Sequence, residues 1–133
     1  MPAPYDTSSD DLSFEWENAT QANQYRAVKP GTTSDKCDLA TANTDVPLGI
    51  IQNNPKLGQH GAVRQTKLSY WEAGGVISAG VGLVPTTGGK AAAYSHAGAY
   101  NASATYTMAT ALSASAADGD YMTVDMWRSH AND

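Results

Sequence analysis

The residues that could do metal or acid–base chemistry are few in this sequence and lie far apart. The histidines are His60, His96 and His130, and no two have the short spacing of a metal-binding pair. A metal site would have to be assembled by the fold alone, so we expect none. His60 lies in the segment GQHG, residues 58–61, which is typical of a turn where an imidazole is simply exposed to solvent.

The candidates for a nucleophile are equally weak. Cys37 is the single cysteine, so no disulfide can form within the chain. A catalytic thiol needs a positive or basic neighbour in space, and nothing in the sequence places one there. We predict a reduced, partly buried thiol. The G-x-S-x-G motif that positions a hydrolase serine is not found in the sequence.

Glycines and acidic residues gather at several points, where they could bind phosphate or calcium. The glycines at positions 74, 75, 80, 82, 88 and 89 fit neither the dinucleotide-binding motif nor the P-loop, so we interpret them as turns. Asp118 and Asp120 flank Gly119, and their carboxylates could bind calcium. Asp and Gly are equally typical of a tight turn with positive φ, which is the interpretation we favour. We therefore expect no cofactor and no enzymatic activity.

Composition and charge narrow the range of partners. The 133 residues carry a formal net charge of −5. The eight Lys and Arg residues form no cluster of more than two in any short stretch of the sequence. Phosphate backbones are bound by such clusters, so we expect no nucleic acid partner. No apolar stretch has the 18 or so residues of a membrane helix. The N-terminus lacks the pattern of a signal peptide, so we expect synthesis in the cytoplasm without export and no membrane partner.

The composition favours tightly turned β-structure. Charged residues make up 16% of the chain, against roughly 25% in an ordinary soluble domain, and small residues take their place. Alternating and apolar segments bounded by Gly and Pro predict short strands. They cover residues 25–29, 35–39, 46–51, 61–68, 70–73, 81–84, 105–112 and 121–127. Residues 91–104 are predicted to form a loop with one short helical turn.

The last predicted strand has two distinct faces. Tyr121, Thr123, Asp125 and Trp127 alternate with three apolar residues, so the two sets should point to opposite sides of a sheet. The apolar set is Met122, Val124 and Met126.

Residues 1–24 differ from the rest in being rich in prolines, acids and small polar residues. Tyr5, Phe14 and Trp16 are scattered among them, and residues 13–17 alternate with the period of a strand. Large aromatic side chains are costly to leave in water. We therefore predict an extended N-terminal arm, residues 1–24, that docks on its own domain or on a neighbouring subunit. Residues 25–133 would form a single β-rich domain.

A weak internal repeat supports a compact β-fold. Residues 48–63 and residues 108–124 each consist of an apolar strand, a polar connection with a glycine, and a returning strand. Two such units could close into a small barrel or sandwich, which would leave few exposed sheet edges. The predicted fold class is therefore mainly β, a small β-barrel or β-sandwich.

The glycines and apolar residues at the centre of the chain carry a resemblance to a known family. The segment WEAGGVISAGVGLVPTTGGKA, residues 71–91, is similar to the pattern of the small capsid decoration (cement) proteins of tailed bacteriophages. LGIIQ at residues 48–52, with Gly58 and GAVR at residues 61–64, resembles a second part of that pattern. The resemblance covers residues 25–127. Val81 departs from it, because the family has a polar residue there.

The resemblance implies a function in the virion. Such proteins are small β-domains that bind the major capsid protein on the outer surface of the head, commonly as homotrimers, and brace the shell. Surface aromatic residues would then make the contacts with partners. The candidates are Tyr5, Phe14, Trp16, Trp71 and Trp127.

Two other functions remain open on the sequence alone. The chain could be another structural part of the virion, such as a head fibre base or a shell-associated protein. It could also be a carbohydrate-binding β-module in which Trp71 or Trp127 stacks on a sugar.

Overall fold

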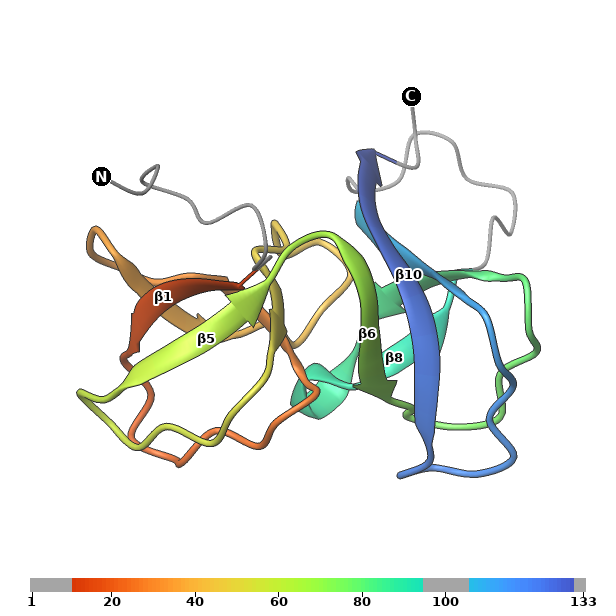
Figure 1. The fold of residues 1–133 in the computed structure, drawn as a ribbon, viewed down its shortest axis with the longest axis horizontal. Coiled ribbons are helices and arrows are strands. Elements are labelled where there is room, and N and C mark those ends of the chain that lie inside the picture. The colour runs from red at the N-terminus through yellow and green to blue at the C-terminus, as the bar shows by residue number, and fades with distance from the viewer. Residues whose placement is uncertain (1–10, 95–105, 131–133) are drawn as a thin grey trace.

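The structure, a computed structural model, describes residues 11–94 and 106–130, and the side chains of Tyr106 and residues 127–130 are not described. Two β-units lie side by side, and the chain passes between them in one arch from β5 to β6 (Figure 1). The first unit is a closed five-stranded barrel and the second is an open five-stranded sheet. The predicted fold class, mainly β with a small barrel, is confirmed.

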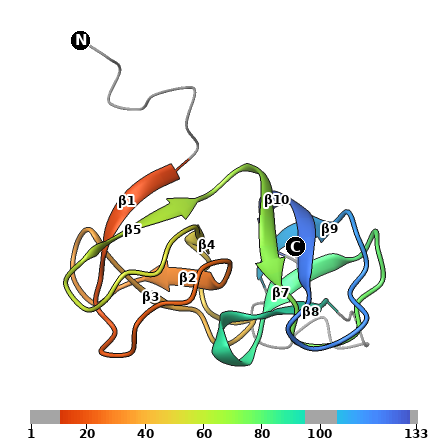
Figure 2. The ribbon, with the colours of Figure 1, turned by 60° about the horizontal axis from the view of Figure 1, so that its bottom comes forward.

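The barrel contains the first five strands in the order β1-β3-β2-β4-β5. They are β1 (Asp11–Trp16), β2 (Ala27–Pro30), β3 (Lys36–Leu39), β4 (Gly49–Ile51) and β5 (His60–Arg64). Antiparallel pairing of β1 with β5 closes the barrel, while β1 and β3 run parallel. Closure satisfies the backbone groups that an open edge would leave unpaired, and Figure 2 shows the strands enclosing a common interior.

The second sheet has the order β6-β10-β9-β7-β8. Its strands are β6 (Lys67–Glu72), β7 (Gly82–Pro85), β8 (Ala91–Ala93), β9 (Tyr106–Ala111) and β10 (Tyr121–His130). A short 3-10 turn, η1 (Thr87–Gly89), connects β7 to β8. All neighbouring strands in this sheet are antiparallel.

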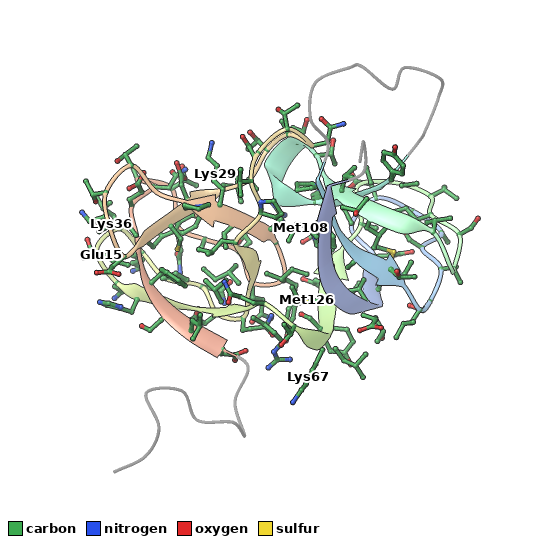
Figure 3. All side chains as sticks on the ribbon, turned by 90° about the horizontal axis from the view of Figure 1, so that it is seen from above. Glu15, Lys29, Lys36, Lys67, Met108 and Met126 are labelled. Carbon is green, nitrogen blue, oxygen red and sulfur yellow. The ribbon has the colours of Figure 1, made fainter. Side chains whose placement is uncertain are left out.

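The two units share a hydrophobic core, and the barrel contains a second, smaller cluster of its own. A smaller cluster inside the barrel is built around Trp16, Val28 and Val63. The larger cluster joins barrel residues such as Ala27 and Ile50 to side chains of the second sheet. The second sheet contributes Trp71, Ala73, Ile77, Leu83, Ala91, Met108, Ala109, Ala111, Met122, Val124 and Met126. Figure 3 shows Met108 and Met126 beside the strands of this sheet.

The predicted N-terminal arm, residues 1–24, requires a correction in its described part. Residues 11–16 form β1, which pairs with both β3 and β5 inside the barrel. Trp16 is only 2% exposed, and the backbone of Ala22 is bonded to Pro55. A boundary at residue 24 is therefore wrong, because the barrel cannot close without β1. Residues 1–10 lie outside the described part of the chain.

The predicted strand at residues 61–68 is also wrong, because the chain changes sheet within it. β5 ends at Arg64 and β6 begins at Lys67, whose φ of 66° turns the chain out of the barrel. Residues 64–68, where the break lies, contain no Gly or Pro to mark it. Residues 91–93, predicted as loop, form β8, and most of the predicted helical turn lies outside the described residues.

Each copy of the weak repeat forms an antiparallel strand pair, β4 with β5 and β9 with β10. The two pairs do not close into one common barrel. The first belongs to the barrel and the second to the open sheet.

Candidate functional site

A groove of about 390 Å³ runs along the junction between the two β-units. Both units contribute its walls: Tyr25 and Gln52 come from the barrel side, and Leu68 and Tyr70 from β6. We call this surface the tyrosine groove. Its full lining is Tyr25, Gln52, Arg64, Leu68, Ser69, Tyr70 and Thr123.

The alternation of β6 and β10 explains which side chains face the groove. On β6, Leu68 and Tyr70 are 55% and 52% exposed, whereas the side chain of Trp71 is fully buried in the core. On β10, Tyr121 is 56% exposed and Met122 is fully buried. Successive side chains of a strand point to opposite faces, so the same strands build the core on one side and the groove on the other.

Tyr25 is held in place by its backbone. It has a positive φ of 65°, which is uncommon for a residue with a Cβ. Its N–H donates to the carbonyl of Ile51 at 2.6 Å, and its own carbonyl accepts from the Glu72 N–H at 2.9 Å. These two bonds join the barrel to β6 through this one residue and fix the direction of its ring.

Three tyrosine rings meet at the groove. The ring of Tyr25 lies edge-to-face against Tyr70, with centroids 5.4 Å apart, and against Tyr121, with centroids 5.5 Å apart. Such pairs contribute about 0.5–1.5 kcal/mol each beyond the area they bury. The cluster is thus a pre-organised aromatic surface, in which Tyr70 and Tyr121 remain about half exposed to solvent.

The polar groups of the groove are held by hydrogen bonds. Gln52 Nε2 donates to Ser69 Oγ at 3.0 Å, and Arg64 donates to the Asp11 carboxylate at 2.8 Å and to the Leu68 carbonyl at 3.0 Å. Tyrosine rings with apolar faces and polar tips, next to a rigid guanidinium, are the composition of a protein-binding surface. The arrangement is suited to recognition.

A second groove of about 410 Å³ lies at the far edge of the second sheet. It is formed by a barrel loop at Thr41 and Asn43 and by the β7 and β8 edge around Pro85 and Ala92. Its described lining is made of small and hydroxyl-bearing side chains together with Tyr94. It offers less apolar surface for recognition than the tyrosine groove.

A cluster of charged side chains lies at the junction of the two β-units, next to η1. The Arg26 guanidinium donates to both carboxylate oxygens of Glu72, at 3.1 and 3.2 Å, and to the Gly88 carbonyl at 3.0 Å. Lys90 Nζ lies 2.8 Å from Asp118 and 3.5 Å from Glu72. The hydrogen bond that Lys90 donates to the Asp118 carboxylate raises the pKa of Lys90. The cluster fixes the position of η1 against the barrel.

The acidic turn at Asp118 and Asp120 has the predicted turn geometry. Gly119 has a φ of 95°, and Asp120 Oδ2 accepts the N–H groups of Ala116 and Ala117. The Asp118 carboxylate is bonded to Lys90. Across residues 11–94 and 106–130, no three His, Cys, Asp or Glu side chains are grouped so that they could hold a metal ion. The same ranges contain no helix with the length and hydrophobicity of a membrane span.

Cys37 is buried more deeply than predicted. Its side chain is inaccessible to solvent in the barrel core. Burial, with smaller contributions from the Asp38 and Glu17 carboxylates, raises the pKa of the Cys37 thiol to about 11. The thiol is therefore neutral and shielded at physiological pH.

The structure describes the side chains of three of the predicted contact residues: Phe14, Trp16 and Trp71. Trp16 and Trp71 lie in the core, with Nε1 donating to the carbonyls of Thr20 and Gly89. Neither ring can stack on a sugar or a partner, which corrects their assignment as surface residues. Phe14 is partly buried against the barrel cluster. Tyr5 lies outside the described residues, and Trp127 lies in β10 with a side chain that is not described.

The sequence did not single out the two tyrosines that line the groove, or Tyr121, whose ring contacts that of Tyr25. Tyr25, Tyr70 and Tyr121 are separated by 45 and 51 positions, and only the fold brings them together. The available signal was their alternation with core residues. Tyr70 precedes Trp71 and Tyr121 precedes Met122, so the tyrosines had to occupy the opposite face.

Comparison with known proteins gives a match to a solved structure. The chain is similar to the crystal structure of the head fibre gp8.5 N base in bacteriophage phi29, with a TM-score of 0.66 and 15% sequence identity. The match covers 90% of this chain and 95% of that chain. No family model matches, and no curated protein matches. At this identity the likeness shows a common fold.

Proposed function

We propose that this protein is a non-enzymatic structural component of a phage head, and more specifically a decoration protein that binds the outer surface of the capsid. The observation that carries the proposal is the match to a head fibre base over nearly the whole of both chains. The residue pattern at residues 71–91 supports it independently, because it resembles the pattern of the decoration family.

The folded arrangement explains what that pattern does. Gly89 has a φ of 76°, and a Cβ there would lie 2.6 Å from Leu39 Cδ1. Gly74 donates its N–H to the Ala91 carbonyl where β6 meets β8. Gly74 thus allows a close approach within the second sheet, and Gly89 lets that sheet pack closely on the barrel, so the pattern encodes part of the two-unit module.

A decoration protein stabilises a shell through many weak contacts. Each copy that bridges neighbouring copies of the major capsid protein needs to contribute only a few kcal/mol to the stability of the shell. Many copies are bound to one shell at once, so their combined effect is large. Self-association, which we propose to be a homotrimer, would match a local threefold arrangement of the shell. The rigid core that the two β-units share suits this role, since a brace that deforms easily would not resist expansion.

A second candidate function is the base of a longer head fibre. The similarity to a fibre base favours it, because that base has the same two-unit fold over almost its full length. Both functions require attachment to a head. They differ in whether a fibre projects from the bound protein.

Co-sedimentation with heads tests the proposal. Purified protein is mixed with undecorated heads of the cognate phage, and bound protein is measured across a range of concentrations. We expect saturable binding and a higher temperature for DNA release from the bound heads. Heads that already carry a full complement are the control and should take up none. Failure to co-sediment at micromolar concentration would contradict the proposal.

A further inference from the structure

We propose that the tyrosine groove is a binding site for a short neutral saccharide, whose sugar rings pack on the tyrosine rings. The inference concerns the isolated protein and does not depend on attachment to heads. It differs from the sugar site that the sequence suggested at Trp71, because the Trp71 ring is buried in the core. It rests on the size of the groove, the exposure of its rings, and its uncharged polar atoms.

The groove has the size of a small-molecule site. Its volume of about 390 Å³ lies within the roughly 300–1,000 Å³ that is usual for such sites. Its walls come from both β-units, which share a core, and Tyr25 is fixed by the backbone bonds to Ile51 and Glu72. The groove is therefore shaped before a ligand arrives, so binding costs little ordering of the protein.

Tyrosine rings supply the apolar contacts. Tyr70 lines the groove and Tyr121 adjoins it, and they are 52% and 56% exposed. Both rings are nearly perpendicular to that of Tyr25, with interplanar angles of 74° and 81°. The carbon-bound hydrogens of a pyranose are slightly positive, whereas the face of an aromatic ring is slightly negative. A sugar ring can therefore pack on an exposed tyrosine while its hydroxyls turn toward polar atoms.

Polar atoms beside the rings are available for those hydroxyls. Gln52 Nε2 donates to two protein oxygens, both at 3.0 Å, which uses both amide hydrogens and leaves Oε1 as an acceptor. Within the described part of the chain, Gln52 Oε1 and Thr123 Oγ1 take part in no hydrogen bond. The phenol oxygens of Tyr25 and Tyr70 have no hydrogen-bond partner among those residues either. An acceptor and several hydroxyls, which both donate and accept, are complementary to the hydroxyls of a sugar.

The electrostatics of the groove favour a ligand without charge. Among the described residues that line it, only Arg64 is charged. Arg64 Nε and Nη2 donate to the Asp11 carboxylate, and Nη1 donates to the Leu68 carbonyl. A phosphate or carboxylate is bound by cationic donors aimed at it, and these donors are aimed at protein oxygens. The polar recognition that remains is neutral, as a saccharide requires.

Titration of the isolated full chain by nuclear magnetic resonance tests the inference. Amide spectra are recorded with maltose, cellobiose, lactose or diacetylchitobiose, each up to about 50 mM, because a site with so few contacts binds weakly. We expect at least one of these disaccharides to shift the signals of Tyr25, Tyr70 and Thr123 in a saturable way. The signals of the second groove should not move. The absence of saturable shifts at the tyrosine groove with every one of these sugars would overturn the inference.

Variants identify the groups that hold the disaccharide. Tyr70→Ala should weaken its binding about tenfold, because the ring contact is lost, whereas Tyr70→Phe keeps the ring and should retain most of the affinity. Thr123→Val preserves the shape of the side chain and should weaken binding about threefold through loss of one hydrogen bond. Tyr94→Ala, which removes a tyrosine from the second groove, is the matched control and should not change the affinity. Equal affinity in Tyr70→Ala and the natural protein would overturn the inference.

Head binding separates this inference from the proposed function. We expect Tyr70→Ala to sediment with undecorated heads as the natural protein does. Loss of head binding in this variant, with no disaccharide shifting the groove signals, would assign the groove to a protein partner and overturn the inference. Disaccharide binding by a protein that does not sediment with heads would support the inference and contradict the proposed function alone.

Discussion

Glu72 illustrates how much of the structure depends on single side chains. Its carboxylate accepts from the Arg26 guanidinium with both oxygens, and its side chain is only 11% exposed. Arg26 lies just before β2 in the barrel and Glu72 ends β6, so this ion pair joins the two β-units. Breaking a shielded pair by removing one partner is destabilising, because the remaining charge loses its compensation.

We predict that Glu72→Gln lowers the free energy of unfolding by about 2 kcal/mol, since Arg26 keeps its charge and loses its ionised partner. The matched control is Glu15→Gln. Glu15 pairs with Lys36 at 3.3 Å on the barrel surface, where both side chains are about a third exposed (Figure 3). That change should cost less than about 1 kcal/mol. Urea denaturation measures both, and equal losses in the two variants would contradict the prediction.

Cys37 provides a test that depends on pH. Its pKa is raised to about 11 from an ordinary value of 9.0. Between these values the unfolded thiol ionises while the folded thiol keeps its proton, so the folded state binds more protons. The stability contributed by this group is therefore fully present below pH 9 and is lost as the pH rises toward 11.

We predict that a disulfide reagent such as Ellman's reagent attacks Cys37 at pH 8 on the order of 100-fold more slowly in the folded protein than in urea, because the thiolate is scarce and shielded. The control is Leu57→Cys, which introduces a second thiol at a site 58% exposed. This second thiol should react at the rate of an unfolded one. Rapid reaction of Cys37 in the natural folded protein would show that the barrel core is open.

At the scale of elements, the strands with a clear alternation were predictable and those fixed by distant contacts were not. The predicted faces of β10 are confirmed from Tyr121 to Met126 by their alternating burial. β1 was assigned to an arm because its acids and small residues are typical of a terminus. Its place in the barrel comes from pairing with β3 and β5, which no local signal encodes. The turn between β5 and β6 likewise depends on Lys67 at positive φ.

The turn η1 packs closely on the barrel and so joins the two units. Gly89 has a φ of 76°, its added Cβ would meet Leu39 and the Ala27 carbonyl, and its own carbonyl accepts from Trp71 Nε1. Gly80 has a similar φ of 89°, but nothing lies within 4 Å of its Cβ position. Replacing Gly80 would therefore add backbone strain alone, whereas replacing Gly89 would add both backbone strain and steric overlap.

We predict that Gly80→Ala costs about 1 kcal/mol, since it adds only the strain of a left-handed residue. Gly89→Ala should cost roughly 3 kcal/mol, because overlap with the barrel is added to that strain. Thermal denaturation followed by circular dichroism measures the difference. Equal losses would mean that η1 does not pack on the barrel as described.

At the scale of the whole molecule, the barrel and the open sheet share a core. Ala27, Ala40 and Ile50 of the barrel belong to the same buried cluster as Trp71 and Met122. The tyrosine groove exists only where these units meet. It could not be predicted from any one segment, since its lining comes from residues 25, 52, 64–70 and 123.

We predict a single cooperative unfolding transition. A shared core makes it unfavourable for one unit to unfold alone, so tryptophan fluorescence and far-ultraviolet circular dichroism should give the same midpoint in urea. The Trp71→Phe variant, which perturbs the shared cluster, should lower both midpoints together. Two separated transitions would show that the units are independent.

Electron cryomicroscopy of heads mixed with the purified protein tests the central claim most directly. We predict additional density on the outer surface of the shell, at sites that bridge neighbouring capsid subunits, into which the two-unit β-fold can be fitted. Shells without added density at saturating protein, or with density only on the inner surface, would contradict the account.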